Sequence, residues 1–74
     1  MTDIPVASLD RILRKAGCKR VSIDAAEALR EITEDFAAEI AKKASKLTFH
    51  SGRQTTSRDD VILAYRGLKR VKES

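Results

Sequence analysis

The side chains of this chain that could do chemistry are almost all cations. The 74 residues hold 15 Lys and Arg against 11 Asp and Glu, a formal net charge of +4. His50 and Cys18 are the only residues of their types and lie far apart in sequence. They form neither a metal-ligand set nor an acid–base pair within one chain. There is no Gly-rich phosphate loop either, so we expect a protein that is not an enzyme and needs no cofactor.

The cations gather toward the two ends of the chain. Residues 1–22 carry five cations against two acids, residues 23–51 carry four against six, and residues 52–74 carry six against three. Basic ends around an acidic middle indicate that the terminal segments hold a polyanion. The alternative is a small basic protein whose lysines only solvate it. Three aromatic residues are too few for a surface that stacks single strands.

One long helix is expected to position these charges. Residues 22–51 contain no Gly and no Pro, begin at Ser22, a favoured N-cap, and stop at Gly52, a favoured residue after a helix end. At 1.5 Å per residue this helix is roughly 43 Å long. A compact monomer of this length is only about 30 Å across. The helix therefore predicts a second chain or a coiled coil. Its apolar stripe, with spacings of three and four, consists of Ala25, Leu29, Ile32, Phe36, Ile40, Ala44 and Leu47.

The charges on this helix indicate how a second chain would lie. The six acids crowd toward its first half, up to Glu39, with Arg30 as the only cation among them, and the three lysines Lys42, Lys43 and Lys46 follow without an acid. This order suits antiparallel pairing of two copies, acidic half against basic half. The helix dipole explains the charge order equally well, so only the length favours pairing.

Two shorter helices flank the long one. Pro5 is expected at the first helical position, and Gly17 ends this first helix. Loops follow at residues 18–21 and 52–56. Ser57 caps the third helix, with Asp60 three residues on, and residues 69–74 are expected to form a frayed basic tail. The apolar faces are Val6, Leu9, Ile12, Leu13 and Ala16 in the first helix and Val61, Ala64, Tyr65 and Leu68 in the third.

These elements predict one all-α domain over residues 1–74. A chain this small buries only about 60% of its unfolded surface, and oligomerisation is the usual remedy without a disulfide or metal. We see no signal peptide and no transmembrane run, and one cysteine fits a reducing compartment. We expect a cytoplasmic protein with no membrane and no small-molecule partner.

The ordered plan resembles the histone fold, and most closely the archaeal histones. The resemblance spans nearly the whole chain, and only the ordered set of motifs is specific. Its residues are Ile-Pro-Val-Ala at 4–7, Arg-Ile-Leu-Arg-Lys-Ala-Gly at 11–17, Arg-Val-Ser at 20–22, His-Ser-Gly-Arg-Gln-Thr at 50–55 and Ser-Arg-Asp-Asp-Val-Ile-Leu-Ala at 57–64.

The resemblance implies an obligate dimer in which two long helices cross antiparallel in a handshake. Each first loop then pairs with the partner's second loop, and double-stranded DNA wraps around the dimer with little sequence preference. The partner is a second copy or a paralogous histone, and dimers can join into longer nucleosome-like filaments. Such a protein is associated with the chromosome.

The resemblance also implies roles for single residues. Arg20 resembles the arginine that enters the minor groove, beside Thr55 of the partner subunit. In this family Arg53 pairs with Asp60 and holds the second loop. Leu47, His50 and Asp60 match the contact between dimers, and Gly17 matches a small residue where successive turns of DNA approach. The remaining DNA-contact candidates are Arg11, Arg14 and Lys15 at a central site, with Lys19, Gln54 and Arg58.

Three residues depart from the family pattern. Gln54 and Ser57 stand where archaeal histones commonly carry cations, and Asp10 replaces a usual small residue. All three changes remove positive charge from the DNA face. Gln54 and Ser57 favour a second hypothesis, a histone-fold subunit of a heteromeric transcription or chromatin complex. A small helical RNA-binding protein is a third hypothesis.

Overall fold

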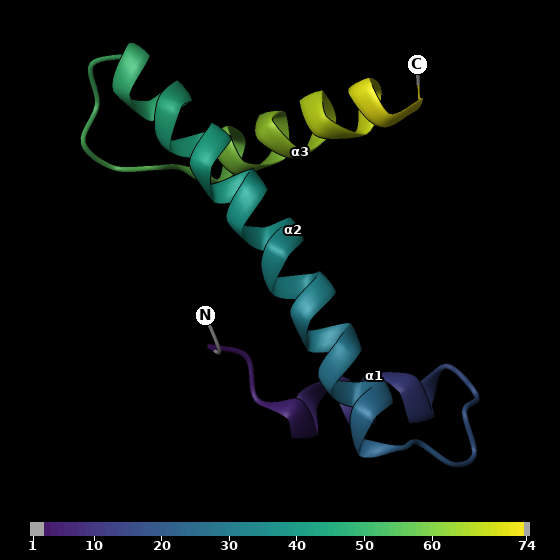
Figure 1. Ribbon diagram of the computed structural model, residues 1–74. Helices are drawn as coiled ribbons and strands as arrows, with labels where there is room; N and C mark the ends of the chain where they lie inside the picture. Colours follow the sequence, from purple (N-terminus) through teal and green to yellow (C-terminus); the bar gives the residue numbers. More distant parts are fainter. Residues whose placement is uncertain (1–2, 74) are drawn as a thin grey trace. The chain divides into compact units, whose positions relative to one another are not determined.

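The computed structural model describes residues 3–73, with side chains up to Lys69, as three α-helices joined by two loops (Figure 1). The helices are α1 (Val6–Lys15), α2 (Ile23–His50) and α3 (Arg58–Glu73). No strand occurs among these residues, so the predicted all-α class and helix order are confirmed. The chain divides into two compact units, Met1–Phe36 and Ala37–Ser74. The first unit holds α1 and the first half of α2, and the second holds the other half of α2 and α3.

Pro5 is the N-cap of α1 and not its first helical residue. Its ψ of 136° is extended, and its carbonyl accepts a hydrogen bond from the Ser8 N–H at 3.1 Å. The expected start was therefore one residue too early. A pyrrolidine ring fixes φ and leaves ψ free, so it suits either position. On the predicted apolar face Leu9 is buried and Val6 half-buried, whereas Ile12 is 55% exposed.

Ser22 caps α2 as expected. Its hydroxyl accepts a hydrogen bond from the Ala25 N–H at 3.0 Å, and its carbonyl accepts one from the Ala26 N–H. The helix then continues without interruption for 28 residues. Within the first unit, Glu34 of α2 accepts a charge-assisted hydrogen bond from the Ile4 N–H at 2.7 Å, which holds the segment before α1.

The second unit has a core of small residues. Ala44 of α2 and Ala64 of α3 are the most buried apolar residues, and the Gly67 backbone lies close to the Lys43 side chain. A β-carbon added at Gly67 would lie 3.2 Å from the Lys43 ammonium nitrogen. Small side chains at these positions permit close packing, but they bury little apolar area.

The prediction that residues 69–74 form a frayed tail is wrong for the part that is described. Helix α3 continues through Glu73, and Ser74 lies outside the described residues. The residues after Gly67 are mostly Leu, Lys, Arg and Glu, which are strong helix formers. Cations at the C-terminal end of a helix also suit its dipole. One glycine does not outweigh both effects.

The described residues contain neither a membrane-spanning helix nor a metal-binding cluster. No helix among them is long and apolar enough to cross a bilayer. No cluster of three or more His, Cys, Asp or Glu side chains among them could hold a metal ion.

Candidate functional site

The first loop, residues 16–22, is set by the way α1 ends. Gly17 adopts a φ of +114°, the Cys18 N–H donates to the Leu13 carbonyl, and the Gly17 N–H donates to the Arg14 carbonyl. This is the Schellman arrangement, in which glycine takes a conformation that is strained for other residues. A β-carbon at Gly17 would meet nothing within 4 Å, so this corner of the chain is open.

Cations project from this loop and from the exposed face of α1. Lys19 and Arg20 are both exposed, and neither forms an ion pair among the described residues. The first unit therefore brings five of the predicted DNA-contact residues onto adjoining elements. They are Arg11, Arg14 and Lys15 on α1, and Lys19 and Arg20 in the loop.

The second loop, residues 51–57, begins with the same device. Gly52 has a φ of +72°, the Arg53 N–H donates to the Thr48 carbonyl, and the Gly52 N–H donates to the Phe49 carbonyl. These hydrogen bonds hold the Arg53 backbone in place independently of the contacts of its side chain. Gln54 and Thr55, the predicted DNA-contact residues of this loop, are exposed.

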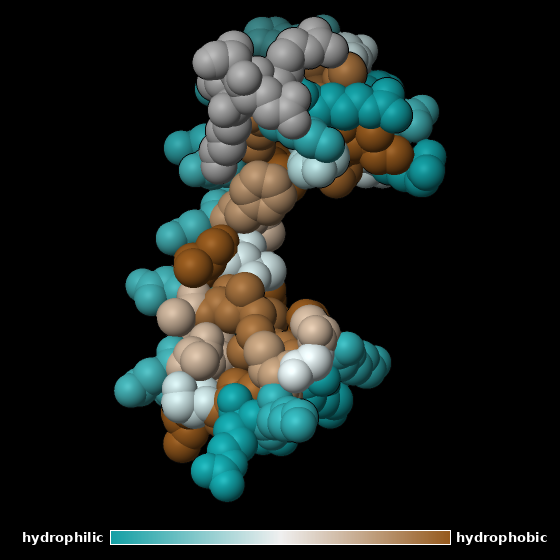
Figure 2. Space-filling view, turned by 90° about the vertical axis from the view of Figure 1, so that its right-hand side faces the viewer, coloured by the Kyte–Doolittle hydropathy of each residue, from teal (hydrophilic) through white to brown (hydrophobic). Residues whose placement is uncertain are grey.

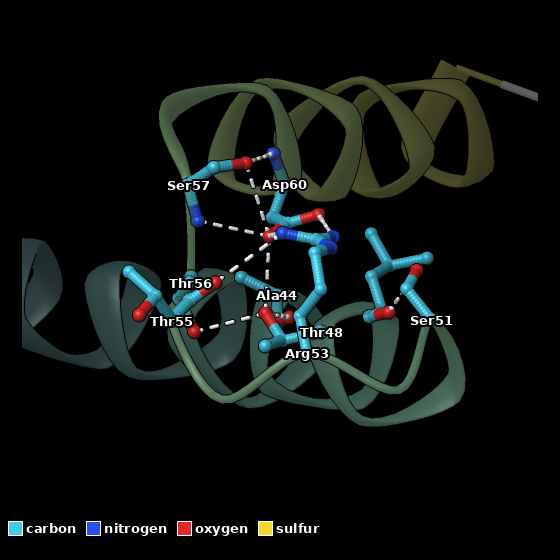
Figure 3. A network of polar contacts seen from close by, with 9 residues as sticks. Ala44, Thr48, Ser51, Arg53, Thr55, Thr56, Ser57 and Asp60 are labelled. Atoms are coloured by element: carbon cyan, nitrogen blue, oxygen red, sulfur yellow. Dashed lines mark hydrogen bonds and ion pairs between the residues drawn. The ribbon is translucent and has the colours of Figure 1, made fainter.

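The carboxylate of Asp60 is the centre of a polar network in the second unit (Figure 3). Arg53 binds it with two hydrogen bonds, from Nη2 to Oδ1 at 2.7 Å and from Nη1 to Oδ2 at 2.9 Å. Ser57 donates to Oδ2 from its N–H and from its hydroxyl, and that hydroxyl accepts from the Asp60 N–H. This is a reciprocal capping box at the start of α3. The structure thus brings Arg53 and Asp60 together.

The network fixes the charge state of Asp60. The Arg53 guanidinium is the largest cause that holds the pKa of this carboxyl well below its ordinary value, and the Ser57 N–H lowers it further. Burial acts in the opposite direction and is outweighed. The same hydrogen bond raises the pKa of Arg53. Asp60 is therefore ionised wherever the protein is folded at neutral pH.

Thr48 belongs to this network, although the sequence did not point to it. Its hydroxyl oxygen lies 2.9 Å from the Ala44 carbonyl, 2.9 Å from the Thr56 hydroxyl and 3.1 Å from Asp60 Oδ2. One hydroxyl has one proton, so Thr48 accepts from Thr56 and donates to one of the other two at a time. Thr48 is only 5% exposed. Its place four residues after Ala44, on the buried side of α2, was a usable signal.

The predicted contact between dimers is only partly assembled in one chain. Leu47 is half-buried and His50 is exposed, and both lie in the last turn of α2. The His50 ring lies edge-on to Phe49, with ring centroids 5.8 Å apart. No hydrogen bond or ion pair among the described residues joins His50 to Asp60, whose carboxylate is already bound by its own chain.

Arg58, at the start of α3, forms only a weak ion pair. Arg58 lies 3.9 Å from Asp59, and both side chains are almost fully exposed. A pair with this geometry contributes little, so Arg58 is available to other partners.

Large apolar side chains are open to solvent in both units, as the brown surface of Figure 2 shows for one face. Ile32 of α2 is 65% exposed, and Phe49 is 78% exposed. No large side chain is fully buried among the described residues. Contiguous apolar surface of this kind is typical of a site that another molecule covers. The others are Ile12 and Ile23 in the first unit and Val61, Leu63 and Tyr65 in the second.

Comparisons with known proteins agree with this plan. The family model described as "Histone-like transcription factor (CBF/NF-Y) and archaeal histone" matches residues 2–65. A Thermococcus zilligii protein, one of the subunits of the archaeal histone HAN1, is 50% identical over 64 residues, which cover 86% of this chain and 96% of that protein. Probable archaeal histone 3 of Methanocaldococcus jannaschii is 45% identical over 67 residues, 90% of this chain and 100% of that protein.

Proposed function

Since the chain belongs to the family of histone-like transcription factors and archaeal histones, we propose that it dimerises and wraps double-stranded DNA with little sequence preference. The open apolar surface of both units carries this proposal. Side chains such as Ile32 and Phe49 are exposed in a single chain. Burying one such side chain is worth roughly 1.5–3 kcal/mol, so a second copy that covers several of them is strongly favoured.

The two copies pair through α2. The acids of its first half and the lysines of its second half face each other if the helices cross antiparallel. The two loops then meet in trans, each first loop beside the partner's second loop. Residues of the two copies thereby contribute to one DNA-binding surface.

Arginine and backbone groups of these paired loops make the DNA contacts. Arg20 enters the minor groove, where an arginine reads groove width and not base identity. The partner's Thr55 lies beside it. Arg53 and Asp60 serve a structural role, because the carboxylate takes up the guanidinium charge and holds the second loop. Phosphate contacts come from Arg11, Arg14, Lys15, Lys19, Gln54 and Arg58.

Dimers then join through Leu47, His50 and Asp60, and Gly17 leaves room between successive turns of DNA. The exposed His50 and the open corner at Gly17 support this arrangement. A partner's His50 binds at Oδ1 of Asp60, which accepts one hydrogen bond, because Oδ2 already accepts three from Arg53 and Ser57 and a fourth whenever Thr48 donates to it. With His50→Ala, nuclease digestion of the reconstituted complex should leave only dimer-sized fragments. An unchanged ladder of fragments would exclude this contact.

A salt series tests the main proposal. Purified protein is titrated onto random-sequence duplexes between about 50 and 200 mM salt, where each phosphate contact contributes about 0.9 to the slope of log affinity against log salt. We expect a steep slope and similar affinity for unrelated sequences. Arg20→Ala should weaken binding to every duplex, whereas Arg66→Ala, which removes the same charge from an exposed position of α3, should not. Failure to bind any duplex at low salt would contradict the proposal.

Membership of a heteromeric complex is the second candidate. One relative is named as one of the subunits of a histone, and Gln54 and Ser57 lower the charge of the second loop. The purified chain alone distinguishes the two. A stable dimer that binds DNA favours the first candidate, and a monomer or an aggregate that a partner chain rescues favours the second.

A further inference from the structure

We propose that Asp10 attenuates DNA binding by the exposed face of α1, because it holds Arg14 in an ion pair that competes with a phosphate. This inference rests on the proposed function and concerns how much the exposed face of α1 contributes to DNA affinity. Arg14 Nε donates to Asp10 Oδ2 at 3.0 Å, one helical turn away.

The three cations of α1 are not equivalent. The Arg11 guanidinium lies 3.5 Å from the Ser8 hydroxyl, which is neutral. Neither Arg11 nor Lys15 forms an ion pair among the described residues, so each offers its full charge. Arg14 alone is matched by a carboxylate, and one of the three positive charges is locally neutralised.

The position of Asp10 explains why it reaches Arg14 and not the others. At about 100° per residue, Asp10 and Arg14 project about 40° apart on the helix, with Arg11 and Lys15 farther around. Asp10 stands at the border between the buried face, which includes Leu9, and the cations. Its side chain is 34% exposed, against 52% for Arg14. A carboxylate at this border is partly shielded, so it is screened less than a free surface charge.

The pair lowers the affinity of this face in two ways. Arg14 must leave or share the carboxylate before it can bind a phosphate with full strength. The carboxylate also repels the phosphate, by about threefold in affinity for charges roughly 7 Å apart in water. Both effects weaken as salt rises, because the Debye length falls to about 8 Å at physiological ionic strength. With two copies of α1 on one duplex, the total is roughly sevenfold per dimer.

The same ion pair also has a second possible role, in which Asp10 orients Arg14 for DNA. The direction in which DNA affinity changes when Asp10 is removed distinguishes the two roles. Only Nε of Arg14 is used by Asp10, so its two terminal nitrogens remain free to bind a phosphate. If the carboxylate served to hold the guanidinium in position, its removal would weaken binding.

The experiment compares Asp10→Asn with wild type for binding to a random-sequence duplex over a salt series. We expect tighter binding at low salt, by roughly threefold to sevenfold, and a gap that narrows as salt rises. Asp3→Asn, which removes an exposed acid from the segment before α1, is the matched control and should change affinity much less. Circular dichroism should show the same helix content in all three proteins.

Arg14→Gln in both backgrounds shows whether Asp10 acts through Arg14. The substitution should cost little in wild type, where Arg14 is paired, and several-fold more in the Asp10→Asn protein. Equal costs in the two backgrounds, or weaker binding by Asp10→Asn, would overturn the inference while leaving the proposed function intact. Refusal of every duplex by wild type and variants alike would overturn both.

Discussion

Asp60 joins three parts of the second unit through one carboxylate. It holds Arg53 of the second loop, caps α3 with Ser57, and contacts Thr48 of α2. Every one of these contacts favours the ionised form, which is why the pKa of Asp60 lies well below its ordinary value. Protonation of Asp60 therefore weakens all of these contacts together.

Asp60 should give the protein a specific sensitivity to acid. A carboxyl with a lowered pKa in the folded state stabilises that state above its unfolded pKa, about 3.9, and this contribution is lost as pH falls below that value. We expect the melting temperature of wild type to fall as the pH is lowered below about 3.9. The Asp60→Asn protein should lack the part of this fall that comes from protonation of Asp60. Thermal unfolding followed by circular dichroism at several pH values measures it.

The control is Asp59→Asn, which removes an exposed neighbour with only a weak pair. It should keep the acid-dependent loss of wild type. If Asp60→Asn and wild type lose melting temperature in parallel, the network does not stabilise the fold through this charge.

The sequence predicted some of these contacts and not others. The spacing of Ser57 and Asp60 indicated a cap, and the resemblance implied the Arg53–Asp60 pair. Thr48 was missed because a single threonine in a long helix has no pattern of its own, and its two partners lie 8 and 12 residues on. Asp10 was read only as lost positive charge, although its distance from Arg14, four residues, is that of a helical ion pair.

Both α1 and α2 end in a Schellman arrangement around a glycine with positive φ. The two loops that carry the proposed DNA contacts thus start from the same backbone geometry. The helix ends were predictable where one residue has a strong local preference, as at Ser22, Gly17 and Gly52. The end of α3 was predicted wrongly, because Gly67 was given too much weight against the helix-forming residues and cations that follow it.

Gly52→Ala should destabilise the protein by about 1–2 kcal/mol. Its φ of +72° is costly for a residue with a β-carbon, whereas nothing lies within 4 Å to add a clash. Gly67→Ala is the matched control, because Gly67 lies inside α3, where alanine gains up to about 1 kcal/mol. The Lys43 side chain has to move aside there. Denaturant unfolding at one protein concentration measures both, and equal effects would contradict this explanation.

The N-cap of α2 should be worth about 1 kcal/mol, so Ser22→Ala should lower the free energy of unfolding by that amount. Ser22→Asp should restore most of it, since aspartate accepts the same hydrogen bond. Ser45→Ala, at an exposed position inside α2, should be neutral or slightly stabilising. If Ser22→Ala costs no more than Ser45→Ala, Ser22 does not act as a cap.

At the scale of the whole molecule, the distribution of buried and exposed apolar side chains supports the proposed pairing with a second chain. Its most buried apolar residues are Leu9 and three alanines, Ala26, Ala44 and Ala64, while its larger apolar side chains remain open. The prediction of a second chain or a coiled coil came from the length of residues 22–51 alone. Whether that partner is a second copy or a related chain could not be predicted, because the charge order of α2 suits both pairing and the helix dipole.

Sedimentation of the purified chain tests the central claim most directly, with circular dichroism on the same samples. We predict two chains per particle across working concentrations, with the helix content of α1, α2 and α3 intact. One chain per particle with the same helix content would contradict the account, because the open apolar surface would then be stable in water without a partner.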